Sequence, residues 1–185
     1  MVYHVSSVSG LTVLKPHVST HGKAWVYAIE NLVTGLLFGI QHDDFDFMIY
    51  HDENGRPVLC ECYPNAFESV YRGKGCSVYE LDDKDFMRGM TSWEPELVCD
   101  HEVPVLNEIP VEDVYERLLS EESQGSLTIQ RYQEDAAYKK RISEHIVDRL
   151  IRFDAIKHLE TDERFRKYYR RLIEALQNIM DGHLL

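Results

Sequence analysis

The spacing of apolar residues changes near Pro110, and this change is the feature that most limits what the chain can fold into. Before Pro110, short runs of β-branched and aromatic residues are separated by turn-forming residues, which is typical of strands. After it, apolar residues recur every three or four positions, which indicates helices. We therefore expect an α+β protein in which a strand-rich N-terminal part precedes a helical C-terminal part.

The N-terminal part contains seven runs that predict strands, with two helices among them. The strands are expected at residues 2–5, 24–28, 45–51, 57–62, 76–81, 96–99 and 103–109, and the helices at residues 30–40 and 65–72. Asn54 and Gly55 lie between two of these runs, where Asn-Gly favours a hairpin. Short strands joined in this way favour mostly antiparallel sheets.

The C-terminal part predicts three helices. One is expected at residues 112–122, before Gly125, and two longer ones follow a short segment at residues 126–132. The first long helix carries an apolar stripe formed by Ile142, Ile146, Leu150 and Phe153. The second is capped by Thr161, and its stripe consists of Phe165, Tyr168, Leu172, Leu176 and Ile179. We expect two domains, at residues 1–125 and 126–185, with the helices packed on the first because such stripes are too apolar to stay exposed.

The charge is distributed unevenly along the chain. Residues 1–130 contain 8 Lys and Arg against 22 Asp and Glu, a net charge of −14, whereas residues 131–185 contain 12 against 10. The acidic body repels phosphate backbones, so we expect it not to bind nucleic acid. The stretch at residues 164–171 mixes cations and aromatic rings as an RNA-binding helix does. Its aromatic residues fall on the apolar stripe, however, which favours a solvated helix face.

Two further features indicate a folded protein of the cytoplasm. No apolar run is long enough to span a bilayer and the N-terminus lacks the pattern of a secretory signal, so we expect no membrane association. The cysteines lack the spacing of a disulfide framework and are expected to be free, buried thiols at Cys60, Cys62, Cys76 and Cys99.

A metal site is also not expected. His17 and His21 are four residues apart, but Pro16 and the Ser19-Thr20 pair predict a loop rather than one face of a helix. The sequence also lacks the spacing of a phosphate-binding glycine loop, a nucleophile elbow and a zinc-protease helix. These enzyme classes are therefore set aside.

Three short segments carry residues that suit chemistry on a ligand. The first strand places His4 directly after Tyr3, and a later strand carries Tyr27 and runs into a helix that reaches Phe38, eleven residues on. A late strand begins at Glu96. In this order the segments resemble the diphtheria-toxin-like ADP-ribosyltransferases, which carry Tyr-His on the first strand, a Tyr and a second aromatic eleven residues apart, and a Glu on a late strand. The resemblance covers about residues 1–115.

The resemblance implies a fold of two mostly antiparallel sheets that form a cleft for NAD, with no metal, and an enzyme that breaks the bond between nicotinamide and ribose. Glu96 would stabilise the positive charge that develops on the ribose. Tyr27 and Phe38 would stack on the nicotinamide ring. His4 would hydrogen-bond a ribose hydroxyl, and the backbone of Val5 would hold the carboxamide. ADP-ribose would then pass to water or to an acceptor that the sequence does not identify, such as another protein.

The chain departs from the family pattern at several positions. Val5 replaces the usual Gly, which narrows the pocket, and Phe38 lacks the hydroxyl of the usual Tyr. Glu94 stands where some members carry an acceptor-activating residue, but Pro95 disfavours that role. The alternative is a non-catalytic binding or regulatory protein on the same fold. A cleft shared by His4, Tyr27 and Glu96 is the observation that favours the enzyme over this alternative.

Overall fold

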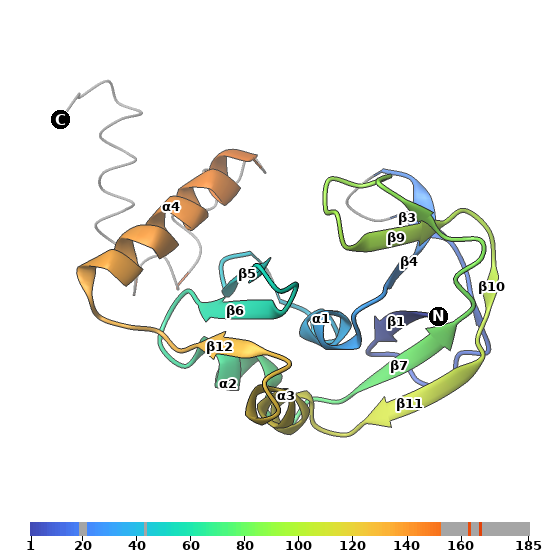
Figure 1. Ribbon diagram of the computed structural model, residues 1–185, viewed down its shortest axis with the longest axis horizontal. Coiled ribbons are helices and arrows are strands. Elements are labelled where there is room, and N and C mark those ends of the chain that lie inside the picture. Colours follow the sequence, from blue (N-terminus) through green and yellow to red (C-terminus); the bar gives the residue numbers. More distant parts are fainter. Residues whose placement is uncertain (19–21, 43, 153–162, 164–166, 168–185) are drawn as a thin grey trace. The chain divides into compact units, whose positions relative to one another are not determined.

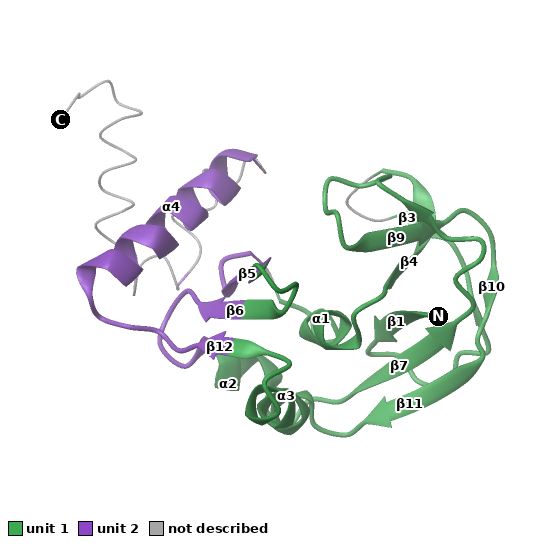
Figure 2. Ribbon diagram, in the orientation of Figure 1, with its two compact units in different colours: residues 1–42, 51–58, 67–128 green, residues 43–50, 59–66, 129–185 purple. Residues whose placement is uncertain are grey.

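The computed structural model describes residues 1–18, 22–42, 44–152, 163 and 167 of the 185-residue chain. The chain forms two compact units that interleave in sequence (Figure 2). The first unit consists of residues 1–42, 51–58 and 67–128, and the second of residues 43–50, 59–66 and 129–185. The expected boundary after residue 125 lies close to the change of unit at residue 128, but the second unit also takes two short segments from the N-terminal part.

An antiparallel sheet is the framework of the first unit (Figure 1). Its strands lie in the order β11-β7-β1-β4-β9-β8, and β3 also pairs with β4. The sheet comprises β1 (Val2–Ser6), β3 (His17–Val18), β4 (Ala24–Ile29), β7 (Cys76–Leu81), β8 (Met87–Arg88), β9 (Glu96–Cys99) and β11 (Asn107–Val111). The mixed strands and helices and the antiparallel pairing confirm the α+β class.

The sheet opens between β1 and β4. These two strands are paired only through Tyr3 and Ile29. By contrast, β1 pairs along its whole length with β7, and β4 pairs through four residues with β9. These strands, expected in two sheets, thus lie in one sheet, whose two antiparallel halves, β11-β7-β1 and β4-β9-β8, are joined by one residue pair. Side chains of β1 and β4 therefore border the space between the two halves.

The expected strand at residues 103–109 is wrong as a single element, because the chain changes partner in its middle. β10 (Val103–Pro104) pairs with β2 (Val13–Leu14), whereas β11 pairs with β7. Between them, the amide of Val105 donates to Thr12 O at 3.0 Å and the amide of Leu106 donates to Glu80 O at 2.9 Å. The change of partner therefore falls between Val105 and Leu106. The short strands β2, β3 and β8 were not expected.

Three short helices accompany the sheet: α1 (Leu32–Leu37), α2 (Ala66–Tyr71) and α3 (Val114–Ser123). Asn31 caps α1, since its side chain accepts from the amide of Thr34 at 3.0 Å. The helix is shorter than the expected 30–40, because the cap sets its start and the amide of Phe38 turns back to Gly35 O at its end. Asp113 caps α3 in the same way.

The second unit contains α4 (Ala136–Arg152) and most of the three-stranded sheet β12-β6-β5. The strands are β5 (Phe47–His51), β6 (Pro57–Glu61) and β12 (Thr128–Gln130), and β12 lies in the short segment at residues 126–132, for which no strand was expected. Ile142, Ile146 and Leu150 are buried along one face of α4, as the stripe predicted. Phe153, the helix expected from Thr161 and the stripe from Phe165 to Ile179 lie outside the described residues.

The strands of the first unit contribute to a buried apolar core. Val2, Val26, Tyr79, Leu97 and Cys99 are among the residues of one buried apolar cluster. All four cysteines are free and buried, as expected. Within the described ranges, no helix has the length and apolar character needed to cross a membrane.

Candidate functional site

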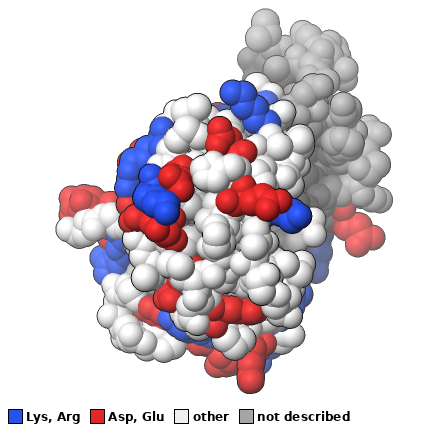
Figure 3. Space-filling model, turned by 90° about the vertical axis from the view of Figure 1, so that its right-hand side faces the viewer, with Lys and Arg blue, Asp and Glu red and all other residues white. Residues whose placement is uncertain are grey.

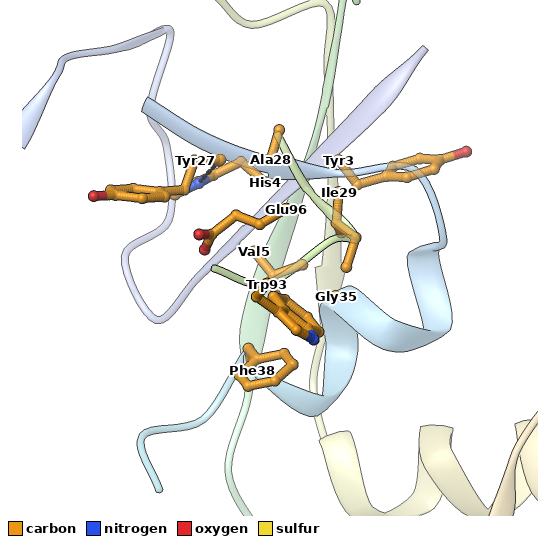
Figure 4. Close-up of a pocket in the computed structure, with 10 residues that line it drawn as sticks. All are labelled: Tyr3, His4, Val5, Tyr27, Ala28, Ile29, Gly35, Phe38, Trp93 and Glu96. Atoms are coloured by element: carbon orange, nitrogen blue, oxygen red, sulfur yellow. Dashed lines mark hydrogen bonds between the residues drawn. The ribbon is translucent and has the colours of Figure 1, made fainter. Parts of the chain in front are cut away.

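A pocket of about 210 Å³ lies at the opening of the sheet (Figure 4). Side chains and backbone from β1, β4, α1 and the start of β9 line it. The lining residues are Tyr3, His4, Val5, Tyr27, Ala28, Ile29, Gly35, Phe38, Trp93 and Glu96. All five residues singled out in the sequence, His4, Val5, Tyr27, Phe38 and Glu96, are therefore brought to one pocket, although 92 residues separate the first from the last.

His4 lies in the gap between the two halves of the sheet. Its Nδ1 is 2.8 Å from Tyr27 O. A carbonyl oxygen only accepts, so Nδ1 carries the proton and Nε2 carries a lone pair. Burial lowers the pKa of His4, the carbonyl of Tyr27 opposes this effect, and nearby His17 lowers the pKa further. The ring is therefore neutral near pH 7 and offers Nε2 as an acceptor to a ligand hydroxyl.

Aromatic rings form much of the pocket wall. Phe38 and Trp93 meet edge to face, with centroids 4.9 Å apart, and Phe38 is 46% exposed. Tyr27 contacts the rings of His17 and Trp25 at 5.8 and 6.2 Å. The aromatic partner of Phe38 is thus Trp93, while Tyr27 lines the pocket from β4. The wall offers apolar, π-rich surface suited to a flat ring.

Trp93 was not identified as a site residue from the sequence. It was visible there only as part of the segment before Glu96, and no spacing rule links it to the pocket. In the structure the amide of Glu96 donates to Trp93 O at 3.1 Å, which closes a turn. This turn brings both side chains to the same pocket.

The carboxylate of Glu96 points into the pocket, between His4 and Tyr27 on one side and Trp93 and Phe38 on the other (Figure 4). Glu96 is the first residue of β9 and pairs with Ile29, next to the single junction between β1 and β4. Glu94 is exposed and does not line this pocket. The structure therefore separates the two glutamates that the sequence places side by side.

Two glycines accommodate Val5. A Cβ at Gly35 would lie 3.1 Å from Cγ2 of Val5, and one at Gly39 would lie 2.8 Å from Cγ1. The Val5 methyl groups therefore occupy the space that side chains at these two positions would need. Val5 and Gly35 both line the pocket.

A second cavity, of about 350 Å³, shares His4 with the first. Its lining includes Ser6, Lys15 and His17. Lys15 also forms an ion pair with Glu102 at 3.2 Å. His17, which is four residues from His21 in the sequence, thus lines this cavity and contacts the ring of Tyr27. His21 lies outside the described residues.

The loop between β1 and β2 borders the second cavity and is tied to the sheet by a carboxylate. Glu108 on β11 accepts from the amide of Gly10 at 3.0 Å and from the hydroxyl of Ser77 at 2.6 Å. These bonds, that from Ser77 above all, lower the pKa of Glu108. Tyr79 donates its hydroxyl to Val8 O at 2.7 Å. The loop carrying Leu11 is therefore fixed beside the cavity that Leu11 helps to line.

Basic groups on the first unit are accompanied by acidic ones. Arg88 pairs with Glu30, and Lys84 pairs with Asp82 at 3.6 Å. In the face shown in Figure 3, basic and acidic side chains lie next to one another. The basic groups of these pairs are therefore partly neutralised by neighbouring carboxylates.

The site combines one carboxylate, a neutral imidazole with an acceptor nitrogen, and aromatic rings that include those of Tyr27, Phe38 and Trp93. Such a set can bind a flat aromatic group, accept a hydrogen bond from a sugar hydroxyl, and place negative charge beside a carbon that becomes positive. No family model matches the chain, and no curated protein or solved structure is significantly similar to it.

Proposed function

We propose that the protein binds NAD with the nicotinamide end in the pocket of Glu96, breaks the bond between nicotinamide and ribose, and passes ADP-ribose to an acceptor or to water. The observation that carries the proposal is the convergence of His4, Tyr27 and Glu96 on one pocket. These are the residues that a diphtheria-toxin-like ADP-ribosyltransferase would use. Residues that only filled a core would have no reason to meet at an accessible pocket.

The charge of Glu96 suits the reaction. Loss of nicotinamide leaves positive charge shared between the anomeric carbon and the ring oxygen of ribose, as in glycoside cleavage. A carboxylate fixed next to this carbon stabilises the transition state more than the ground state, because the substrate carries less positive charge on the ribose. Glu96 is part-buried beside Trp93 and Phe38, and in such surroundings its charge acts more strongly than in water.

The aromatic wall and His4 suit the parts of NAD next to the broken bond. The nicotinamide ring would lie against Tyr27, Phe38 and Trp93, which is a larger aromatic set than the Tyr27 and Phe38 pair expected from the sequence. A ribose hydroxyl would donate to Nε2 of His4, whose tautomer is fixed by the carbonyl of Tyr27. The ring and the sugar would thereby be held from two sides of Glu96.

The size of the pocket limits what it holds. At about 210 Å³ it is smaller than the roughly 300–1,000 Å³ of sites for drug-sized ligands. It therefore suits a nicotinamide and its ribose rather than a whole dinucleotide. The cavity that shares His4 offers about 350 Å³ for the rest, with Lys15 and His17 as the groups that would face phosphates.

The experiment is a nicotinamide-release assay with the full chain and NAD, in which free nicotinamide and ADP-ribose are separated chromatographically. Glu96→Gln keeps the shape of the side chain and removes its charge, so we expect the rate to fall by roughly a hundredfold or more with NAD binding nearly unchanged. Glu94→Gln is the matched control, since Glu94 is exposed and outside the pocket. We expect this variant to react like the wild type.

The outcomes separate the enzyme from the alternatives. NAD binding without nicotinamide release, even with candidate acceptor proteins added, would overturn the catalytic proposal and favour a non-catalytic binding protein on the same site. Neither binding nor release would overturn the proposal as a whole. Release that is equal in the wild type and Glu96→Gln would show that the chemistry takes place elsewhere.

A further inference from the structure

A second group of chemically reactive side chains lies at the far end of β9, outside the pocket of Glu96. Cys99 is the last residue of β9, and Asp100 and His101 follow it in a bend. One ligand atom from each of these three residues lies within 4.8 Å of the others. From this geometry we propose that Cys99, Asp100 and His101 bind a divalent ion of the zinc class. The proposal is independent of NAD binding and differs from the sequence expectation that the protein has no metal.

The distances within the group match those around a tetrahedral ion. Sγ of Cys99 is 3.4 Å from Nδ1 of His101, and this nitrogen is 3.0 Å from Oδ1 of Asp100. A tetrahedral Zn²⁺ with ordinary bond lengths holds a sulfur and a nitrogen ligand about 3.5 Å apart, and a nitrogen and an oxygen ligand about 3.4 Å apart. These two separations lie within a few tenths of an ångström of those values, and all three ligand atoms lie within 4.8 Å of one another.

A carboxylate also lies near the second ring nitrogen of His101, where metal-binding histidines commonly have an outer partner. With Nδ1 facing the ion, the proton lies on Nε2, and Nε2 is 3.6 Å from Oδ2 of Asp85. A carboxylate that accepts from the second ring nitrogen fixes the tautomer and the orientation of the ring. Asp85 comes from the segment between β7 and β8, so the ion would link this segment to the end of β9.

The nature of the ligands selects the class of ion. A thiolate, an imidazole and a carboxylate suit Zn²⁺ or Co²⁺, whereas Mg²⁺ and Ca²⁺ prefer oxygen alone. Cys99 is fully buried, while His101 and Asp100 are exposed, so the ion would lie at the surface with the sulfur beneath it. Three protein ligands leave a fourth position for water.

A simple ion pair is the competing explanation. A protonated His101 between Asp85 and Asp100 would account for the two carboxylates. It gives no role to the thiol of Cys99, which lies within 3.5 Å of both ring nitrogens and donates to the carbonyl of His101 at 3.7 Å. Metal binding would displace this thiol proton to solvent and leave the thiolate as a ligand.

The test is a Co²⁺ titration of the full chain after chelator treatment, under reducing, oxygen-free conditions. A cobalt–thiolate bond gives a charge-transfer band in the near ultraviolet, and we expect the band to saturate at one equivalent and to disappear when Zn²⁺ is added. Cys99→Ser should abolish the band. Cys76→Ser is the matched control, because Cys76 is also a buried thiol of the first unit but has no place in this cluster.

Two variants of exposed residues keep the test valid if Cys99→Ser does not fold. His101→Gln removes a ligand and should abolish saturable binding. Asp85→Asn removes only the outer carboxylate and should weaken Co²⁺ binding by roughly ten- to a hundredfold. Absence of a thiolate band in the wild type would overturn the proposal. So would a band that survives in Cys99→Ser or in His101→Gln, or one that is lost in Cys76→Ser.

Discussion

The contact between Val5 and the glycines after β4 provides a quantitative prediction. Gly39 is buried, and a Cβ added there would lie 2.8 Å from Cγ1 of Val5 and 3.0 Å from Sγ of Cys76. Contacts this short do not occur between real side chains, so Gly39→Ala forces its neighbours to move. Val5 is β-branched and stiff. We therefore expect Gly39→Ala to lower the free energy of unfolding by about 1–3 kcal/mol, the usual cost of overpacking.

A double-mutant cycle of Gly39→Ala and Val5→Ala measures how much of this loss of stability comes from the contact with Val5. Val5→Ala alone should destabilise by about 1.6 kcal/mol, since two methyl groups are lost at about 0.8 kcal/mol each. In the Val5→Ala background, Gly39→Ala should cost clearly less than alone, because the shortest contact is gone and those with Sγ of Cys76 and O of Leu36 remain. We expect a coupling energy of at least about 0.5 kcal/mol.

Urea unfolding followed by tryptophan fluorescence is the appropriate assay, because Trp25 and Trp93 are the two tryptophans of the chain and both belong to the first unit. The signal therefore reports the unit that contains the contact. Strictly additive effects of the two substitutions, or a Gly39→Ala variant as stable as the wild type, would refute the packing of Val5 against this glycine.

Three further predictions concern the pocket and its neighbouring cavity. Tyr27→Ala should raise the dissociation constant of NAD by roughly tenfold while Tyr27→Phe keeps it, and calorimetry that finds both variants equal would count against stacking. The rate of nicotinamide release should fall on acidification only below pH 6.5, because burial lowers the pKa of His4 from this ordinary value. Protonation of His4 removes the Nε2 acceptor, so the pH–rate profile of His4→Asn should lack this inflection. Lys15→Ala should raise the KM for NAD by roughly two- to fivefold at low salt, whereas Lys23→Ala, outside both cavities, should not.

Local patterns in the sequence were sufficient to predict most of the strands and helices. The strand predicted at residues 96–99 coincides with the observed strand Glu96–Cys99, because a short stretch of β-branched and apolar residues is flanked there by turn-forming residues. The stripe through Ile142, Ile146 and Leu150 was found from helical spacing and is buried. These features depend on neighbours in the chain, which the sequence contains.

Features that depend on distant neighbours were not predicted. The break between β10 and β11 follows from a change of partner from Thr12 to Glu80, two residues far apart in sequence. The interleaving of the two units likewise depends on which segments meet, and no local signal marks residues 43–50 or 59–66 as part of the second unit. Trp93 was missed for the same reason, since its place in the pocket depends on the position of Phe38.

The order of the candidate residues along the chain was a useful guide to the site for a physical reason. His4, Tyr27 and Glu96 lie on three strands that are adjacent in the order β1-β4-β9. Residues on adjacent strands and near the same register are close in space however far apart they are in sequence. The pairing of Tyr3 with Ile29 and of Ile29 with Glu96 sets the register of these three strands.

The alternation of β9 connects the two proposed sites. Successive residues of a strand point to opposite faces, so Glu96 is directed to the pocket while Leu97 and Cys99 are directed to the apolar cluster. Cys99 consequently reaches the bend with His101 from the core side, and Glu96 reaches the pocket from the other side. A shift of β9 by one residue against β4 would exchange these faces and disrupt both sites at once. The pairing of Ile29 with Glu96 is therefore the contact on which the carboxylate and the thiol both depend.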